Sequence, residues 1–127
     1  MKNTNAHFDS ALNSVIWEIN GFVSFEDFKK AGNLTHTLRK KHKTDKQINN
    51  ILDMKVLSKE IQNWIDSTYF PDAKKSGLKH FAFIVPKNTF GKLSMEKVNA
   101  DASKIYEMEV EYFNNADEAT RWLNSIN

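Results

Sequence analysis

The residues with the clearest chemical potential lie in the stretch ILDMKVLS at positions 51–58, where a carboxylate, an amine and a hydroxyl follow an apolar run. The apolar run predicts the end of a strand, and the serine predicts the start of a helix. Ligand sites in open α/β sheets gather at the carboxyl ends of parallel strands. We therefore expect a ligand- or partner-binding rim formed by Asp53, Met54, Lys55 and Ser58.

A purely structural role accounts for the same residues. Asp53 could accept backbone N–H groups in the connection, and Ser58 could cap the next helix, which stabilises it by about 1 kcal/mol. Capping explains Ser58 completely. A phosphate added to Ser58 would nevertheless meet a helix N-terminus beside Lys55 and Lys59, so Ser58 is also a candidate phosphorylation site.

Other catalytic chemistries have little support in the sequence. The chain has no cysteine, which excludes disulfides and thiolate chemistry and suits a reducing compartment. Its four glycines are isolated, so no phosphate-binding loop is present, and we expect no cofactor and no metal. A small hydrolase or transferase that pairs Asp53 with a histidine is the alternative to a binding protein. Four histidines could serve, of which we expect His36 to be exposed or half-buried: His7, His36, His42 and His80.

Charge is distributed unevenly along the 127 residues. Residues 28–95 contain 14 Lys/Arg and 5 Asp/Glu, a net charge of +9, whereas both ends of the chain are acidic. The basic run Arg39–Lys43 makes nucleic-acid binding a third and less favoured alternative. Because no aromatic residues interleave with this run, a solvated helix face is the better interpretation.

Strand-like and helix-like segments alternate four times. Period-two patterns predict strands, apolar residues at three- and four-residue spacing predict helices, and Pro71 predicts the end of the second helix. The expected strands lie within residues 14–23, 48–52, 79–86 and 107–113, and the expected helices begin after Ser24, Ser58, Ser94 and Asn115.

This alternation predicts an α/β fold in which parallel strands are joined by right-handed crossovers. The run FAFIV at residues 81–85 is apolar on both faces and should be central, whereas the glutamates of EMEVEYF at residues 107–113 predict an edge strand. We expect one domain, residues 1–127, because no linker or repeat divides the chain. No apolar run approaches the ~20 residues of a membrane helix.

Several motifs are similar to those of a known family. The pieces GLKHFAFIVP and YFNNADEATRWL, together with FEDF, NWID and TFGK, resemble the bacterial SpoIIAA-like proteins, which are STAS/CRAL-TRIO-like single domains. The resemblance runs from Val15 to Leu123. It implies a (βα)4 superhelix with a mostly parallel sheet of four to five strands and helices mainly on one face.

The resemblance also implies a function. We expect a non-enzymatic, cytosolic (cytoplasmic) binding or regulatory module that recognises a protein partner or a small apolar ligand. In related STAS domains a serine or threonine at the start of a helix is phosphorylated, and Ser58 lies in a similar place. This chain departs from the usual Asp-Ser pair, because MKVL separates Asp53 from Ser58.

The central strand raises a question of burial. If helices cover one face only, the second apolar face of residues 81–85 needs another cover, since exposed apolar area is unfavourable. Residues 1–13 could be either a flexible segment or that cover, and a second copy of the chain is the other candidate. We therefore expect a homodimer.

Overall fold

The computed structural model describes residues 2–55, 57–86 and 107–126. Ten elements follow one another in these ranges: β1 (Thr4–Asp9), β2 (Ser14–Gly21), α1 (Phe25–His42), β3 (Lys46–Met54), α2 (Lys59–Trp64), η1 (Ile65–Tyr69), α3 (Phe70–Lys75), β4 (His80–Ile84), β5 (Glu109–Phe113) and α5 (Ala116–Asn124). The helix expected after Ser94 lies outside the described residues.

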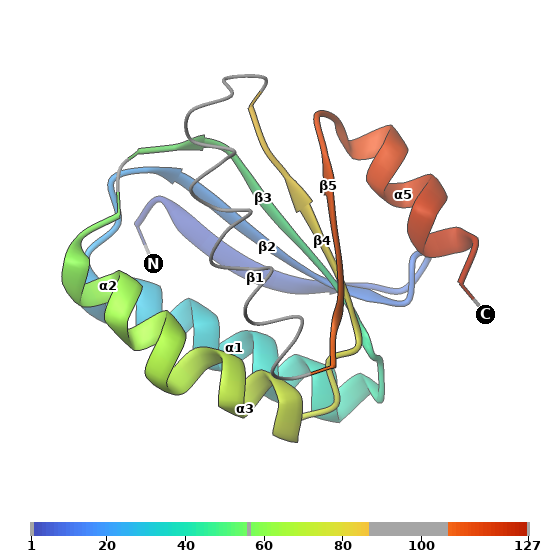
Figure 1. Ribbon diagram of the computed structural model, residues 1–127, viewed down its shortest axis with the longest axis horizontal. Helices are drawn as coiled ribbons and strands as arrows, with labels where there is room; N and C mark the ends of the chain where they lie inside the picture. The colour runs from blue at the N-terminus through green and yellow to red at the C-terminus, as the bar shows by residue number, and fades with distance from the viewer. Residues whose placement is uncertain (1, 56, 87–106, 127) are drawn as a thin grey trace.

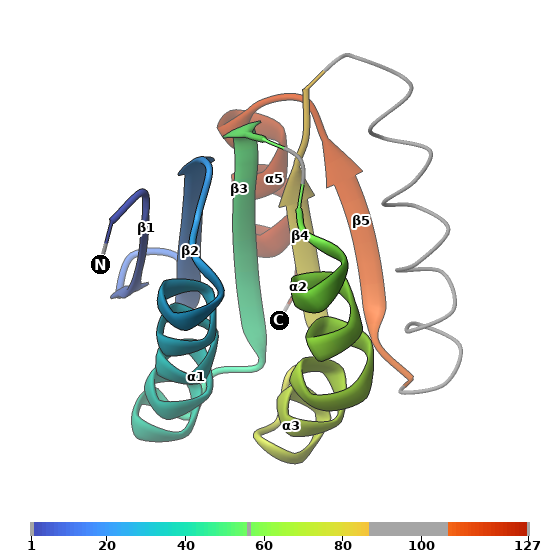
Figure 2. The same cartoon turned by 90° about the vertical axis from the view of Figure 1, so that its left-hand side faces the viewer.

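The five strands form one sheet in chain order, β1-β2-β3-β4-β5. The pairs β2–β3, β3–β4 and β4–β5 are parallel, and only β1 runs antiparallel to its neighbour. Figure 2 shows this order from one edge of the sheet to the other. The predicted α/β class and the mostly parallel sheet are confirmed, with β4 inside the sheet and β5 as its last strand.

Side-chain caps fix the helix starts where the sequence predicts them. The hydroxyl of Ser24 accepts a hydrogen bond from the N–H of Asp27, and the amide oxygen of Asn115 accepts one from the N–H of Glu118. Each cap satisfies a first-turn N–H that has no partner within its helix. The helix α1 ends at His42, and Lys43 follows in the left-handed conformation.

The predicted end of the second helix at Pro71 is wrong. Helical backbone runs from Lys59 to Lys75, because a π-helical turn, η1, lies between α2 and α3. In this turn the N–H of Phe70 bonds to the carbonyl of Ile65, five residues earlier. The wider turn lets the proline ring enter a helix without the clash that it would make with an α-helical carbonyl.

The larger core lies between the sheet and the layer formed by α1, α2, η1 and α3 (Figure 1). Gly32 of α1 lets two tryptophans approach the helix backbone. A Cβ added there would lie 2.8 Å from Trp64 and 3.2 Å from Trp17. The expectation that something packs closely against Gly32 is therefore confirmed.

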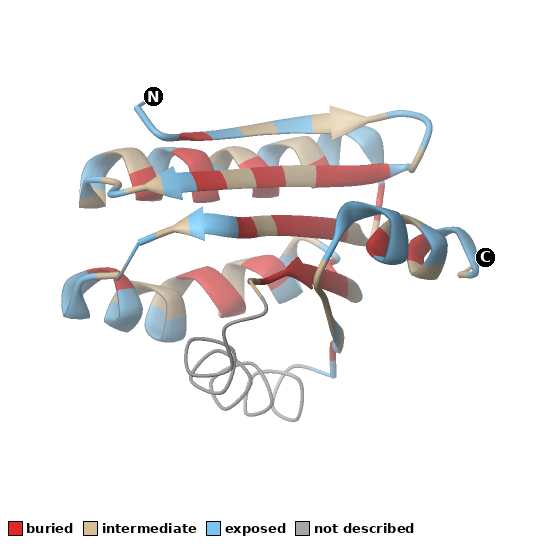
Figure 3. Cartoon of the chain, turned by 90° about the horizontal axis from the view of Figure 1, so that it is seen from above, coloured by how far each residue is buried: buried red, intermediate tan, exposed pale blue. Residues whose placement is uncertain are grey.

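The second face of the sheet is covered in part by α5. Buried Ala119 and Leu123 of α5 pack against Ile48, Ala82 and Ile84 of the sheet. Figure 3 shows buried strand residues between the layers. Residues 1–13 contain β1 and the half-buried Leu12, which packs against this second cluster. The premise that a second copy must cover the apolar second face of β4 is therefore wrong, because α5 covers that face.

Candidate functional site

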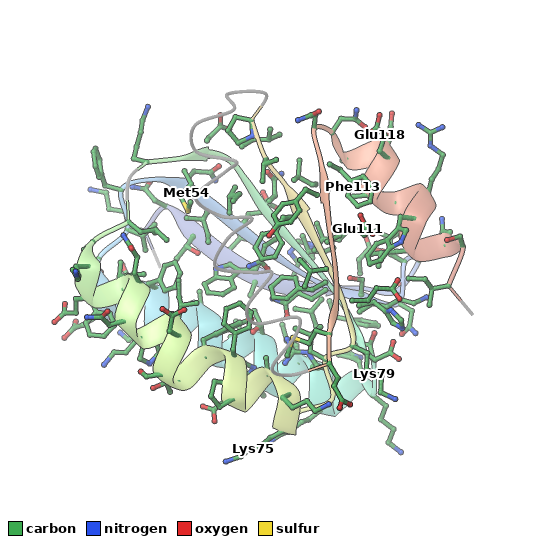
Figure 4. All side chains as sticks on the ribbon, in the orientation of Figure 1. Met54, Lys75, Lys79, Glu111, Phe113 and Glu118 are labelled. Carbon is green, nitrogen blue, oxygen red and sulfur yellow. The ribbon has the colours of Figure 1, made fainter. Side chains whose placement is uncertain are left out.

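Three of the four residues of the predicted rim lie at the carboxyl end of β3, and Ser58 lies at the start of α2. Asp53 and Met54 are the last two residues of the strand, and Lys55 follows directly. Figure 4 labels Met54 at this end of β3. The N–H of Lys55 donates to the carbonyl of Gly21 at 3.0 Å, which ties the rim to the end of β2. The predicted location at the end of a parallel strand is therefore the observed one.

A shift in register between β2 and β3 decides which rim side chains point outward. Glu18 pairs with Asn50, but Asn20 pairs with Asp53, so β3 has one extra residue in this interval. Such a bulge interrupts the alternation of faces. Met54 consequently packs against the larger core, while Asp53 is exposed.

Asp53 and Ser58 of the rim have different surroundings. The Ser58 hydroxyl accepts a hydrogen bond from the N–H of Ile61 at 3.1 Å, which confirms its capping role. The Asp53 carboxylate accepts no hydrogen bond from any described residue, so the expectation that it organises the connection is not met in the described part of the chain.

The structure also contradicts the enzymatic pairing of Asp53 with a histidine. His80 pairs with Lys46, which lies seven residues before Asp53 in β3. His80 and Asp53 are therefore separated by about 23 Å along the strand direction. The other three histidines are also displaced from the rim along the strand direction. His7 pairs with Ile16, His42 stacks on Phe8, and His36 bonds to Arg39 near the start of β3.

The basic run does not form one exposed surface. Lys40, Lys41 and Lys43 are exposed, but Arg39 is 0% exposed and points into the larger core. The expected nucleic-acid surface Arg39–Lys43 therefore lacks its arginine, the side chain best suited to phosphate.

Arg39 instead belongs to a buried polar network that the sequence analysis missed. Its Nη1 donates to the Oγ of Ser76 at 2.6 Å and to the Nδ1 of His36 at 2.9 Å, and its Nη2 donates to the Oε1 of Gln47. The Nε2 of Gln47 donates to the hydroxyl of Tyr69 at 2.8 Å. The network thus joins α1, β3 and the π-helical turn.

Further polar side chains complete this network. The Nε2 of Gln47 also donates to the Oδ1 of Asn49, and the hydroxyls of Thr35 and Tyr69 lie 2.9 Å apart. The sequence contained a signal for this network. Thr35 and Arg39 lie on the same side of α1 as buried Phe28. Gln47 and Asn49 lie on the same face of β3 as buried Ile51. Polar residues on a core-facing stripe indicate a buried network.

Burial governs the charges of this network. Desolvation first, and then the positive charges of Arg39 and Lys40, lower the pKa of His36 to about 3. His36 is therefore neutral near pH 7, and its Nδ1 must be unprotonated because arginine can only donate. Burial also lowers the pKa of Arg39, while Tyr69 opposes that shift.

Among the described residues, the exposed large apolar side chains lie at the carboxyl ends of β2 and β3. Phe22 is 73% exposed and Leu52 is 38% exposed. Gly21 has a φ of +67°, and the next residue, Phe22, is held by a hydrogen bond from Asn3 to its carbonyl, so the strand ends with Phe22 displayed to solvent. Four apolar residues close in sequence to Phe22 and Leu52 are half-buried and pack against the larger core: Val23, Phe25, Met54 and Leu57.

Two further features are absent from the described parts of the chain: a cluster of metal ligands and a membrane-spanning helix. Residues 2–55, 57–86 and 107–126 contain no group of three or more His, Asp or Glu side chains placed to hold a metal ion. Within the same ranges, no helix has both the length and the apolar character needed to cross a bilayer.

The described residues form a small α/β domain with a mostly parallel five-stranded sheet and helices on both faces. Residues 15–124 match the SpoIIAA-like family, and the chain belongs to that family. The predicted family and fold are therefore confirmed. No curated protein matches the sequence.

A solved structure has the same fold. It is an uncharacterized protein of the DUF3478 family with a SpoIIAA-like fold from Shewanella loihica PV-4, with a TM-score of 0.68 and 18% sequence identity. The alignment covers 94% of this chain and 91% of that one. At this level of identity, the similarity concerns the fold alone.

Proposed function

We propose that this protein is a non-enzymatic binding module that recognises an apolar group of a protein partner through the carboxyl end of its sheet. The recognition surface, which we call the carboxyl-end rim, comprises Phe22, Leu52, Asp53, Met54, Lys55 and Ser58. The observation that carries the proposal is the 73% exposure of Phe22 at the place where parallel α/β sheets bind their ligands.

An exposed aromatic ring favours a protein partner over an enclosed small molecule. Aromatic side chains are the commonest energetic centres of protein interfaces, where a partner removes them from water. A small apolar ligand would be expected to sit among inward-facing side chains. Charged Asp53, Lys55 and Lys59 are exposed around this surface and suit the polar border of an interface.

Phosphorylation of Ser58 is a second part of the proposal. The hydroxyl is on an exposed residue at a helix start, between exposed Lys55 and Lys59. A phosphate there would place about two negative charges inside the rim and change its affinity for a partner. Intact-mass measurement of protein purified from its own cells, followed by fragmentation, tests this: a phosphate on another residue only, or none under any growth condition, rules it out.

Site-specific cross-linking tests the rim itself. A photoreactive amino acid at position 22 or 52 should capture the same protein in the host cells, whereas one at exposed Thr37 on α1 should not. Capture that is identical from all three positions would contradict the rim. Native mass spectrometry of the purified chain provides the other outcome: a small apolar molecule bound to the protein, with no partner captured, would replace the proposed protein partner.

A further inference from the structure

The sheet has a free edge at β1. In Figure 2, β1 is the outermost strand, and no described helix or strand lies beyond it. An unpaired edge strand offers a row of backbone N–H and C=O groups to another strand, and proteins commonly protect such edges with charge or proline. Between Thr4 and Phe8 the sequence TNAHF contains neither an acid, a lysine nor a proline.

The register shows which backbone groups of β1 are free. The N–H of Asn20 donates to the carbonyl of Asn3, and the antiparallel ladder continues with Asn5 opposite Glu18 and His7 opposite Ile16. Because hydrogen-bonded and non-bonded pairs alternate, the odd-numbered residues face β2. The backbone groups of Thr4, Ala6 and Phe8 therefore point away from the sheet.

Thr4, Ala6 and Phe8 can pair with the same three residues of a second copy that is related by a two-fold axis. With the axis at Ala6, two antiparallel copies of β1 pair Ala6 with Ala6, and Thr4 with Phe8, through their free backbone groups. Asn5 then lies opposite His7 on the second face, so no like-charged carboxylates or ammonium groups meet. The same operation on β5 would oppose Glu111 to itself, which is unfavourable.

One side of α1 points to the same edge. The Asp27 carboxylate accepts from the backbone N–H of Lys2 at 3.3 Å, and the His42 ring stacks on Phe8 at 3.9 Å. Leu34 and Leu38 share this side by helical spacing. Both leucines are half-buried, and neither belongs to the two core clusters.

Pairing through β1 would cover these leucines. The helix α1 contacts both β1 and β2, and strands lie about 4.8 Å apart. Two α1 helices related by the axis would then be separated by roughly the 8–10 Å at which helices pack. Their antiparallel course also brings the acidic first turn of one α1 toward the basic last turn of the other.

We infer that a second copy of this chain docks on β1 and on the leucine side of α1, forming a two-fold dimer with a continuous ten-stranded sheet. The inference does not depend on the proposed function, because none of its residues lies in the carboxyl-end rim. A variant that no longer binds the partner should still form the dimer, and a variant that no longer forms the dimer should still bind the partner.

Sedimentation of the purified chain over a concentration series tests the interface. The double variant Leu34→Lys/Leu38→Lys should weaken the dimer by about tenfold or more, because four lysines would gather at the axis. The variant Asn33→Lys/Thr37→Lys adds the same charge on the exposed side of α1 and should leave association unchanged. A wild-type chain that is monomeric at its highest soluble concentration, or a dimer that both variants affect equally, overturns the inference.

A cysteine trap gives a second and independent test. The natural sequence has no cysteine, so Ala6→Cys introduces a single thiol at the axis, where paired Cα atoms lie about 5.5 Å apart, within disulfide range. Mild oxidation should link Ala6→Cys into a covalent dimer and leave Thr37→Cys monomeric. Failure of Ala6→Cys to link under conditions in which the folded wild type is dimeric contradicts the β1 pairing.

Discussion

A fully buried arginine defines the interior of this protein at the scale of single residues. Arg39 has no carboxylate partner among the described residues and depends on the neutral acceptors His36, Gln47 and Ser76. A buried charge is tolerated only when hydrogen bonds replace its water. Its Nε and the Nε2 of His36 remain unpaired within this network, so the remaining bonds should be strongly interdependent.

Gln47 is the link to test in this network. We expect Gln47→Leu to destabilise the fold by about 3 kcal/mol, because it removes a charge-assisted hydrogen bond and leaves a buried guanidinium with one acceptor fewer. The double variant Arg39→Met/Gln47→Leu should cost less than the sum of the two single variants. Urea unfolding measures both, and strict additivity of the two costs would contradict the coupling.

His36 predicts a pH dependence of stability. Its folded pKa of about 3 lies below the ordinary value of 6.5, so the unfolded chain binds the extra proton between these values. Stability from this residue is complete above pH 6.5 and is lost as the pH falls toward 3, by at most about 1.4 kcal/mol per pH unit. Unfolding measured between pH 7 and 5 should show this slope in the wild type. The slope should be reduced in His36→Gln and retained in His42→Gln.

The sequence predicted this interior poorly, for a physical reason. Arg39 stands beside Lys40 and Lys41, and a lysine-rich neighbourhood normally indicates a solvated helix face. Its position at helical spacing from Phe28 and Thr35 places it on the core side instead. Tyr69 is brought to Arg39 and Gln47 by tertiary packing across 22 residues or more of sequence, which no local pattern encodes.

At the scale of elements, the helix caps were predictable and the π-helical turn was not. Ser24, Ser58 and Asn115 accept first-turn N–H groups as their residue types suggest. A proline usually ends a helix at the preceding residue, but a five-residue hydrogen bond from Phe70 to Ile65 accommodates Pro71. Tyr69, the last residue of this turn, takes part in the buried network through its hydroxyl.

Close packing of α1 on two tryptophans gives a prediction for Gly32. Alanine favours a helix by about 1 kcal/mol over glycine, yet its Cβ would lie 2.8 Å from Trp64 and 3.2 Å from Trp17. We expect Gly32→Ala to destabilise the protein by about 1–2 kcal/mol net, since overpacking outweighs propensity. Asn33→Ala, at the adjacent exposed position, is the control and should not destabilise the protein. Thermal unfolding of both variants measures the difference. A Gly32→Ala variant that is more stable than the wild type would contradict this prediction.

Ser58 separates the structural role of the rim from its proposed role in binding. Ser58→Ala removes the cap of α2 and should lower the free energy of unfolding by about 1 kcal/mol. Ser58→Asp keeps an acceptor at the cap and should retain most of that stability. If both variants unfold like the wild type in urea, the cap has no energetic importance.

At the scale of the whole molecule, the alternation of strands and helices was enough to predict the sheet. The apolar run of β4 predicted an interior strand and the glutamates of β5 predicted an edge, and both lie there. The antiparallel strand β1 was missed, because TNAHFD has little apolar alternation and depends on pairing with β2. The position of α5 on the second face was likewise set by packing rather than by local pattern.

The molecule presents two kinds of free surface at different places. The carboxyl-end rim displays Phe22 and Leu52, and the β1 edge displays backbone groups beside Leu34 and Leu38. Because the two surfaces share no residue, one can bind a partner while the other pairs with a second copy. A dimer would then present two rims, which increases avidity for a partner with two binding sites.

The most direct test of this account is the affinity of the cross-linked partner, once purified, for variants of the rim. Calorimetric titration should show that Phe22→Asp weakens binding by about tenfold or more, while Thr37→Asp binds like the wild type and both variants keep the wild-type melting temperature. Equal affinity of wild type, Phe22→Asp and Leu52→Asp would contradict the central claim that the carboxyl-end rim is the recognition surface.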